Sequence, residues 1–429
     1  MSTFRIIFTV VIIAFAVLGM IVIATFRGGD TAAFGNTNGA VVVWGTLPQE
    51  MMGPFVATLR QQFEGFEVTY VEKQPEAFDQ ELVEAIASGR SPDVALLPSE
   101  LILRFEDKVS MIPYDYLSER DFRDDFIEGS EIYLSPQGII GLPFVVDPLV
   151  MYWNRDLFAN ARKTLPPTTW EEVKLLAREM TIQTQGVITT SAIALGEWRN
   201  ITHAKEIFAH LLLAGGNPIV SRTSQGLTSV LGNSFNKSPI PAEAALIFYT
   251  DFSNPNQLVY SWNRALRPSR EMFLAGKLGI YFGLGSDVLG LHEANPNLNF
   301  DVAEIPRTQG ADSARGFGKF HAFSVLRSAP NPSGAFTAAQ VFTSPEAGTL
   351  FTTYSTFAPA RRALLAETPT DPFRASFFRA AIIARAWLDP NPQESDSVFQ
   401  EMIESASSGS ARINQAVLRA HEALRRLLQ

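Results

Sequence analysis

Acidic and aromatic side chains that follow apolar runs are the residues of this sequence that could bind a ligand. Trp44 closes one apolar run and Glu100 follows another, while Glu197 and Trp198 are adjacent in a predicted loop. An aromatic face can stack on the apolar face of a ring-shaped solute, and a carboxylate accepts hydrogen bonds from hydroxyl groups. Each also has a structural alternative, since a tryptophan can fill a core and a carboxylate can cap a helix.

Asp147 lies in an otherwise apolar predicted strand. A buried carboxylate without a partner is costly, so it is expected either to bind a ligand or to accept hydrogen bonds from backbone amides. The turn at residues 283–287 (GLGSD) offers backbone amides and the hydroxyl group of Ser286 to a ligand. Trp153, at the other end of the strand that holds Asp147, is expected to pack in the core.

Catalytic motifs are absent from the sequence. The 5 histidines are scattered, and neither a zinc-protease motif nor a nucleophile elbow nor a phosphate-binding loop occurs. There is no cysteine, which excludes disulfides, thiolate metal sites and a lipid-modified cysteine. We therefore predict no catalytic residue, no metal site and no cofactor. A glycan hydrolase that uses Asp147 and Glu197 as paired carboxylates remains an alternative, because the sequence does not give their separation.

The N-terminal region predicts export. Residues 6–26 carry no charge and at about 1.5 Å per residue could span a bilayer core. Arg5 lies on the short side, which places residues 1–5 in the cytoplasm and the remainder outside a cell membrane crossed once. A cleaved signal peptide is the alternative. Residues 27–39 are rich in glycine, asparagine and threonine and are expected to form a flexible linker.

The length and net charge of the chain limit the number of domains and the kinds of partner that the protein can have. Residues 40–429 exceed what one hydrophobic core usually serves, so two domains are expected. The formal net charge of −9 argues against nucleic acid as a partner, because phosphate binding needs a basic face.

The elements that position these residues alternate between strand and helix. Apolar runs at residues 40–44, 66–71 and 93–97 predict buried strands, and helical spacing at 51–63 and 78–88 predicts the helices between them. This order is typical of an open, mostly parallel sheet, in which ligands lie beyond the carboxyl ends of the strands. Trp44 and Glu100 occupy those ends.

Further along the chain, the pair Thr169 and Glu172 forms a capping-box signature that begins a helix. Strands are predicted at residues 278–282 and 320–326. Helical patterns at 377–388 and 400–428 close the chain, with the last predicted as one continuous helix.

The segment GLPFVVDPLVMYWNRDLF at residues 141–158, followed by PTTWEE at 167–172, resembles the hinge region of ABC-importer solute-binding proteins. The subfamily is the carbohydrate-binding one that includes maltose-binding protein. Shorter blocks match the same family in order: FLAGKLG at 273–279, TSPEAG at 343–348, APARR at 358–362 and WLDP at 387–390. The resemblance covers nearly all of residues 40–429.

This resemblance implies an α/β fold of the type II periplasmic-binding-protein class, with two lobes that each hold a mostly parallel sheet flanked by helices. Lobe one would comprise residues 40–143 and 318–356, and lobe two residues 144–317 and 357–429. The chain would cross between the lobes three times. The implied hinge residues are Pro143, Gly316, Gly318 and Pro359.

By the same resemblance, a sugar or oligosaccharide is gripped between the lobes and passed to separate ABC permease subunits. The uncharged run at residues 6–26, if it is not cleaved, would tether the protein to the membrane. The implied ligand-binding residues are Asp147, Trp44, Glu100, Glu197, Trp198, Trp262, Ser286 and Phe399. Trp262 could equally be a core residue, as could Phe399. The maltose binder has a stacking tryptophan where this chain has the turn at residues 283–287, so maltose specificity does not transfer. A membrane-bound sensory module is a further alternative.

Overall fold

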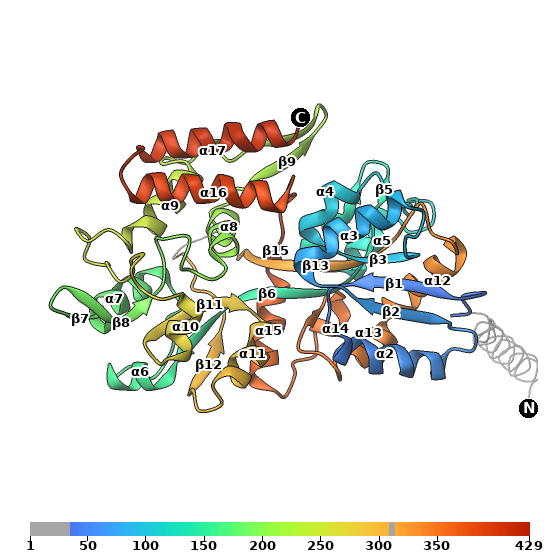
Figure 1. The fold of residues 1–429 in the computed structure, drawn as a ribbon, viewed down its shortest axis with the longest axis horizontal. Helices are drawn as coiled ribbons and strands as arrows, with labels where there is room; N and C mark the ends of the chain where they lie inside the picture. The colour runs from blue at the N-terminus through green and yellow to red at the C-terminus, as the bar shows by residue number, and fades with distance from the viewer. Residues whose placement is uncertain (1–34, 309–313) are drawn as a thin grey trace, which may run out of the picture.

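A computed structural model describes residues 35–308 and 314–429 (Figure 1). The predicted cytoplasmic end at residues 1–5 and the predicted membrane helix at 6–26 lie outside the described residues, as does most of the predicted linker. Within the described ranges, no helix is both long and apolar enough to cross a bilayer.

The first half of lobe one follows the predicted alternation of strand and helix. The strands are β1 (Val41–Gly45), β2 (Val68–Glu72) and β3 (Val94–Pro98), and β1 lies between the other two, parallel to both. The helices α2 (Gln49–Gln62) and α3 (Pro75–Ala87) form the crossovers. All five residues of β3 are buried, as expected for a strand covered on both faces.

Two long strands connect the halves of the molecule. β6 (Leu142–Asn154) is buried along its whole length, and β13 (Gly316–Val325) pairs with it antiparallel, with Lys319 opposite Asp147. β13 also pairs antiparallel with β3, and β6 pairs antiparallel with β11 (Leu278–Leu284). One sheet therefore runs from one lobe into the other, as Figure 1 shows along β13 and β6.

This sheet is mixed, so the prediction of mostly parallel sheets was wrong. Its strand order is β2-β1-β3-β13-β6-β11-β8-β7, and β6 and β13 run antiparallel to each other and to the main strands beside them. The β-α-β pattern near the start of the described chain correctly predicted the parallel strands β1, β2 and β3. The antiparallel strands return from distant parts of the chain, and local periodicity carries no information about their direction.

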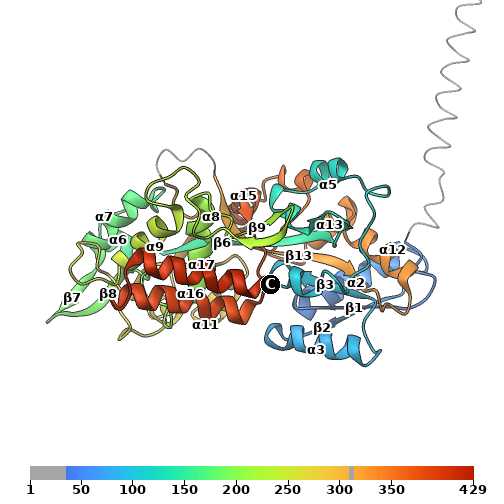
Figure 2. The same ribbon diagram turned by 90° about the horizontal axis from the view of Figure 1, so that it is seen from above.

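In lobe two, α7 (Trp170–Met180) begins with the predicted capping box of Thr169 and Glu172. β8 (Val187–Ile193) lies beside β11 and parallel to it, and α8 (Ala204–Ala214) is buried beneath the other helices. The last predicted helix is two helices, α16 (Pro392–Ser407) and α17 (Ile413–Leu427), which lie side by side in Figure 2. The break follows from Gly409, whose φ of 74° ends the first helix.

The remaining elements complete the two lobes. In lobe one they are η1 (Ser99–Leu101), α4 (Ile102–Phe105), α5 (Glu119–Asp125), η2 (Glu128–Tyr133), β4 (Leu134–Ser135), β5 (Gly138–Ile139), α12 (Pro332–Phe342), α13 (Pro345–Phe351), β14 (Ala358–Pro359) and α14 (Arg362–Leu365). In and beside lobe two they are α6 (Arg155–Asn160), β7 (Ile182–Thr184), β9 (Val220–Thr223), β10 (Gly226–Ser229), α9 (Pro241–Asp251), α10 (Ser269–Leu274), α11 (Asp287–Ala294), β12 (Phe300–Ala303), α15 (Pro372–Ile382) and β15 (Ala384–Arg385).

Each lobe has its own hydrophobic core, and the connecting strands pass from one core to the other within a few residues. On β6, Val146 packs in the core of lobe one and Leu149 in the core of lobe two. On β13, Phe317 belongs to lobe two and Phe320 to lobe one. The residues between these positions, among them Lys319, lie at the junction of the lobes.

Candidate functional site

Lys319 joins the two lobes through carboxylates that it contacts on either side. Its Nζ lies 3.3 Å from Oε2 of Glu100, which follows β3 in lobe one, and 3.1 Å from Oε1 of Glu206, which lies in the first turn of α8 in lobe two. Burial alone would raise the pKa of Glu206, but the charges of Lys319 and His203 outweigh it and lower that pKa to about 2. The bridge is therefore ionised at neutral pH.

The bridge continues into lobe two through His203. Its Nε2 lies 2.9 Å from Oδ2 of Asp287, the oxygen that also accepts a hydrogen bond from the hydroxyl group of Tyr281 at 3.0 Å. Its Nδ1 lies 3.9 Å from Oε2 of Glu206. Burial opposes the charged imidazolium, yet the two carboxylates raise the pKa of His203 above its ordinary value.

Lys205, adjacent to Glu206, is held by a second set of acceptors. Its ammonium group donates to Asp389 at 2.7 Å, to the Ser395 hydroxyl group at 2.7 Å and to the Pro392 carbonyl oxygen at 2.8 Å. It also lies 5.7 Å from the centre of the Trp387 ring, within the range of a cation–π interaction. All three ammonium protons therefore have partners.

These groups surround a cavity of about 160 Å³ between the lobes. Its polar walls offer carboxylates, two ammonium groups and a hydroxyl group, and its apolar walls include two aromatic rings. This combination suits a small polar solute, which hydrogen-bonds to the charged groups and packs on the rings. The residues that line it are Ser99, Glu100, Lys205, Glu206, Phe317, Lys319, Ala386, Trp387, Asp389 and Pro392.

The structure brings Asp147 and Ser286 together, as two of the predicted site residues. Oδ1 of Asp147 accepts a hydrogen bond from the Ser286 amide at 3.0 Å, and Oδ2 accepts one from the Ser286 hydroxyl group at 2.6 Å. The carboxyl group is only 4% exposed, and burial raises its pKa to about 6 despite these bonds. Asp147 therefore ties the turn after β11 to the connecting strand β6.

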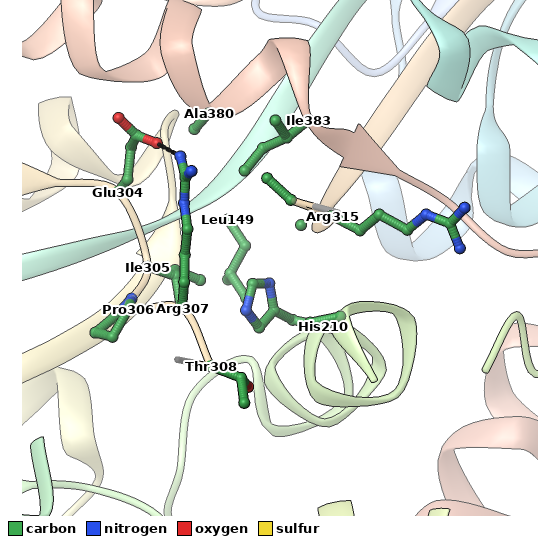
Figure 3. A pocket seen from close by; sticks show the side chains of 13 residues that line it. Leu149, His210, Glu304, Ile305, Pro306, Arg307, Thr308, Arg315, Ala380 and Ile383 are labelled. Carbon is green, nitrogen blue, oxygen red and sulfur yellow. Dashed lines mark hydrogen bonds and ion pairs between the residues drawn. The ribbon is translucent and has the colours of Figure 1, made fainter. Parts of the chain in front are cut away.

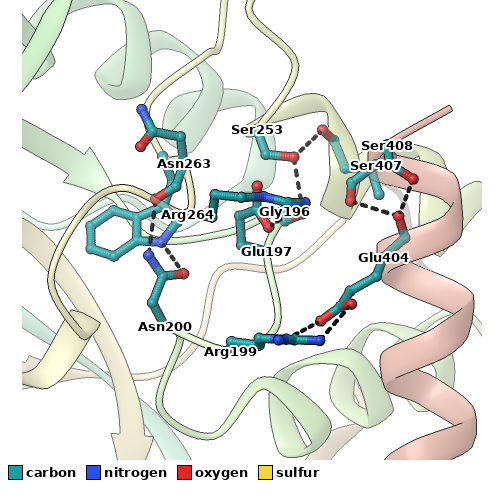
Figure 4. Close-up of polar contacts among 12 residues, drawn as sticks. Gly196, Glu197, Arg199, Asn200, Ser253, Asn263, Arg264, Glu404, Ser407 and Ser408 are labelled. Carbon is teal, nitrogen blue, oxygen red and sulfur yellow. Dashed lines mark hydrogen bonds and ion pairs between the residues drawn. The ribbon is translucent and has the colours of Figure 1, made fainter.

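Glu197 and Trp198 lie in the loop before α8, at the edge of this charged region. Glu197 is nearly buried and its Oε2 lies 3.4 Å from the Arg264 guanidinium group, as Figure 4 shows. The Trp198 side chain is also buried and hydrogen-bonds to Asp396, a carboxylate that interacts with Lys205. Burial raises the pKa of Asp396. The pair thus contacts the charged residues beside the cavity without lining it.

The other predicted aromatic residues are placed differently. Trp44 is half-buried at the end of β1, with the Lys73 ammonium group 3.8 Å from the centre of its ring. Trp262 is fully buried and its indole N–H donates to Asn200 at 3.1 Å. Phe399 is fully buried against the rings of Phe208 and Trp387. Among the predicted site residues, only Glu100 lines the cavity itself.

Sequence reasoning missed the residues that make the centre of this site, namely Lys205, Glu206, Lys319, Trp387 and Asp389. Asp389 and Trp387 belong to the WLDP block that supported the family resemblance, and Lys319 follows a predicted hinge glycine. These positions were the available signal. In the sequence, however, the charged residues among them look the same as charged residues on a solvent-exposed helix or loop.

A second cavity, of about 140 Å³, lies beside the connecting strands in lobe two (Figure 3). His210 and Arg307 line it, but Nδ1 of His210 accepts a hydrogen bond from the Phe317 amide and Arg307 pairs with Glu304. Burial lowers the pKa of His210 to about 4, so the imidazole is neutral at physiological pH. In the described part of the chain, no cluster of histidine, aspartate and glutamate could hold a metal ion.

Comparison with known proteins identifies the matching family. Residues 55–374 match the model of the family described as "Bacterial extracellular solute-binding protein". A binding protein of Brucella abortus (strain 2308) is 24% identical over 277 residues, and the match spans 62% of this chain and 62% of that protein. A binding protein of Brucella suis biovar 1 matches to the same extent.

Solved structures share the fold. A cyclo/maltodextrin-binding protein complexed with maltotetraose superposes with a TM-score of 0.72 at 15% identity, over 91% of this chain and 97% of that one. A cyclic α-maltosyl-1,6-maltose binding protein from Arthrobacter globiformis gives a TM-score of 0.72 at 17% identity, over 91% and 99%. At these identities the likeness shows the two-lobe α/β fold.

Proposed function

Because this chain belongs to the family of bacterial extracellular solute-binding proteins, whose members bind solutes and are not enzymes, we propose that it captures a sugar or similar polar solute for an ABC importer. The solute is held between the lobes and delivered to separate permease subunits. The structural neighbours that bind maltodextrins support the choice of a sugar, as does the supply of carboxylates and aromatic rings in the cavity.

One observation carries this proposal: the cavity is built from both lobes at once. Glu100 comes from lobe one, Glu206 from lobe two, and Lys319 from the strand that connects them. A solute in this cavity would contact both lobes, and it would favour the closed arrangement because only there are all the contacts made. Closure follows from that difference in affinity between the open and closed forms.

The proposed ligand-binding residues are those at or beside the cavity. Glu100, Lys319 and Glu206 would contact the solute directly, and Trp387 would pack on it. Asp147 and Ser286 would fix the turn that faces the cleft, and Glu197 and Trp198 would support the charged residues beside it. Trp44 is proposed as a stacking surface once Lys73 moves. Trp262 and Phe399, which are buried, are proposed only as core supports.

We propose the lobe boundaries implied by the resemblance, residues 40–143 with 318–356 and 144–317 with 357–429, with one change: residues from 357 to the start of α15 are assigned to lobe one. The change of core on β6 lies between Val146 and Leu149, a few residues after Pro143, and the change on β13 lies between Phe317 and Phe320, beside Gly316 and Gly318. For the third, the packing favours α15 over Pro359, because Phe377 packs in lobe two and its neighbour Phe378 in lobe one. The type II assignment is likewise retained as a proposal.

We also propose that residues 6–26 tether the protein to the cell membrane, with residues 1–5 in the cytoplasm and residues 27–39 as a spacer. The uncharged run in the sequence supports the tether. Protease treatment of intact cells tests this arrangement, because the lobes should be digested only if they lie outside.

The function is tested by a thermal-shift screen of the full-length protein, in mild detergent, against sugars, oligosaccharides, polyols and peptides. A solute at about 100 times its dissociation constant should add about 2.7 kcal/mol to the free energy of unfolding. Recovery of the solute intact supports a binding protein. Consumption of the solute would refute the proposal and favour a glycan-active enzyme.

A further inference from the structure

We propose that the solute bound between the lobes carries a protonated amine, so that the solute is an amino sugar or a similar basic, hydroxyl-bearing molecule. This inference rests on the proposed function and adds the charge of the solute to it.

The walls of the cavity carry more negative than positive charge. Three carboxylates line it, from Glu100, Glu206 and Asp389, against the two ammonium groups of Lys205 and Lys319. One negative charge therefore has no counterpart in the lining. Between two protein lobes such an excess of like charge is unfavourable, and a cationic ligand would remove it.

The groups directly behind the lining increase the excess. Asp147 interacts with Lys319 and Asp287, and Asp396 interacts with Lys205 and Glu206. Among the described residues behind the lining, His203 is the one cationic group that interacts with these carboxylates, and it is paired with Asp287. The groups behind the lining thus add three carboxylates, those of Asp147, Asp287 and Asp396, and only one imidazole.

The lysines of the cavity are already engaged, whereas one carboxylate is accessible. Lys205 donates to Asp389, Ser395 and Pro392, so it has no proton left for a solute. Glu100 is the most exposed of the lining carboxylates, at 37%, and Lys319 is its ion-pair partner within the described ranges. A solute that enters the cavity therefore meets the Glu100 carboxylate first, as an available acceptor.

Glu100 and Asp389 define the position for a cation. Both line the cavity, and the negative charge of Glu100 adds to burial in raising the pKa of Asp389, although Lys205 and Ser395 oppose the shift. The two carboxylates thus repel each other across the cavity. An ammonium group placed between them would relieve this repulsion and donate charge-assisted hydrogen bonds to Glu100.

The same cavity already shows how it accommodates an ammonium group, because Lys205 occupies one end of it. There the ammonium group lies near the Trp387 ring and is surrounded by a carboxylate, a hydroxyl oxygen and a carbonyl oxygen.

The test is titration calorimetry of the full-length protein with glucosamine, N-acetylglucosamine, glucose and putrescine, near neutral pH. Glucosamine should bind about tenfold more tightly than glucose, since a charge-assisted hydrogen bond is about twice as strong as a neutral one. N-acetylglucosamine should bind no more tightly than glucose. The glucosamine affinity alone should fall when salt is raised.

The variant E100Q keeps an acceptor for hydroxyl groups and removes the charge, so the ratio of the glucosamine affinity to the glucose affinity should fall from about ten to about one. The matched control is E346Q, which neutralises an exposed glutamate in the first turn of α13, also in lobe one. This control should keep the preference.

Each outcome separates the inference from the proposed function. If glucose binds as tightly as glucosamine or more tightly, the inference of an amine-bearing solute is refuted and the proposal of a sugar-binding protein stands. Binding of putrescine but of none of the three sugars supports an amine-bearing solute and refutes a sugar as the solute. A preference for glucosamine that survives in E100Q overturns the position assigned to the cation, and binding of none of the four compounds overturns the inference.

Discussion

Replacing Lys319 with methionine should destabilise the protein, because it leaves two facing carboxylates without their shared cation. The magnitude follows from Glu206, which is 14% exposed and whose pKa is about 2 in place of the ordinary 4.5. At about 1.36 kcal/mol per pKa unit this shift corresponds to about 3 kcal/mol. His203 contributes part of it, so K319M should lose about 2 to 3 kcal/mol at neutral pH.

The expected loss depends on pH in a defined direction. The folded-state pKa of Glu206 lies below its ordinary value, so the stabilisation is complete above about pH 4.5 and disappears as the pH falls toward about 2. The difference between K319M and wild type should shrink over the same range. For folding units of 150 to 250 residues, about 2 to 3 kcal/mol corresponds to roughly 4 to 12 °C in melting temperature.

Thermal and urea unfolding of the full-length protein, followed by tryptophan fluorescence, measures this loss. The double variant K319M/E206Q should regain part of it, since the unpaired carboxylate is then neutral. The control K163M breaks the exposed pair with Glu179 and should cost less than about 1 kcal/mol. A loss below about 1 kcal/mol in K319M, or strict additivity in the double variant, would refute the argument.

Three further predictions concern other parts of the site. Burial raises the pKa of Asp147 to about 6, so wild type should lose about 2 to 3 kcal/mol as the pH rises from about 4 to about 7, and urea titrations should show that D147N lacks this loss. R222A removes the 3.1 Å ion pair with Glu106 across the lobes, so X-ray scattering should show a larger radius of gyration, and an unchanged radius would exclude a role in closure. W262F loses the hydrogen bond to Asn200, so thermal unfolding should show a loss of about 1 to 3 kcal/mol. Calorimetry should find its solute affinity unchanged, and weaker binding would place the tryptophan in the cleft.

Local patterns predicted the elements of the fold well where they describe neighbours in sequence. The strands before and after α2 and the capping box at Thr169 follow directly from apolar periodicity and helix-capping chemistry. The break at Gly409 was missed because the hydrophobic pattern of α16 continues in phase with that of α17. The direction of β13 was also missed, since antiparallel pairing with β3 depends on a distant part of the chain.

The candidate site was predictable only in part, because it is assembled from separate elements. Glu100 could be identified from its position after a strand, where ligands of α/β sheets lie. Lys205 and Glu206, in contrast, look like ordinary charges in the first turn of a helix. Trp262 and Phe399 show the converse error, since an aromatic side chain has the same sequence signature whether it faces a cleft or fills a core.

The pairing of β6 with β13 also has a consequence for how the protein is made. Val145 and Val146 pair with residues of β13, which are synthesised only after residues 147–315 have been translated. Until then, β3 and β6 each lack a neighbour, and their buried faces remain open to chaperones and proteases. Both cores also contain residues of β13, so neither core is complete until that strand has been synthesised.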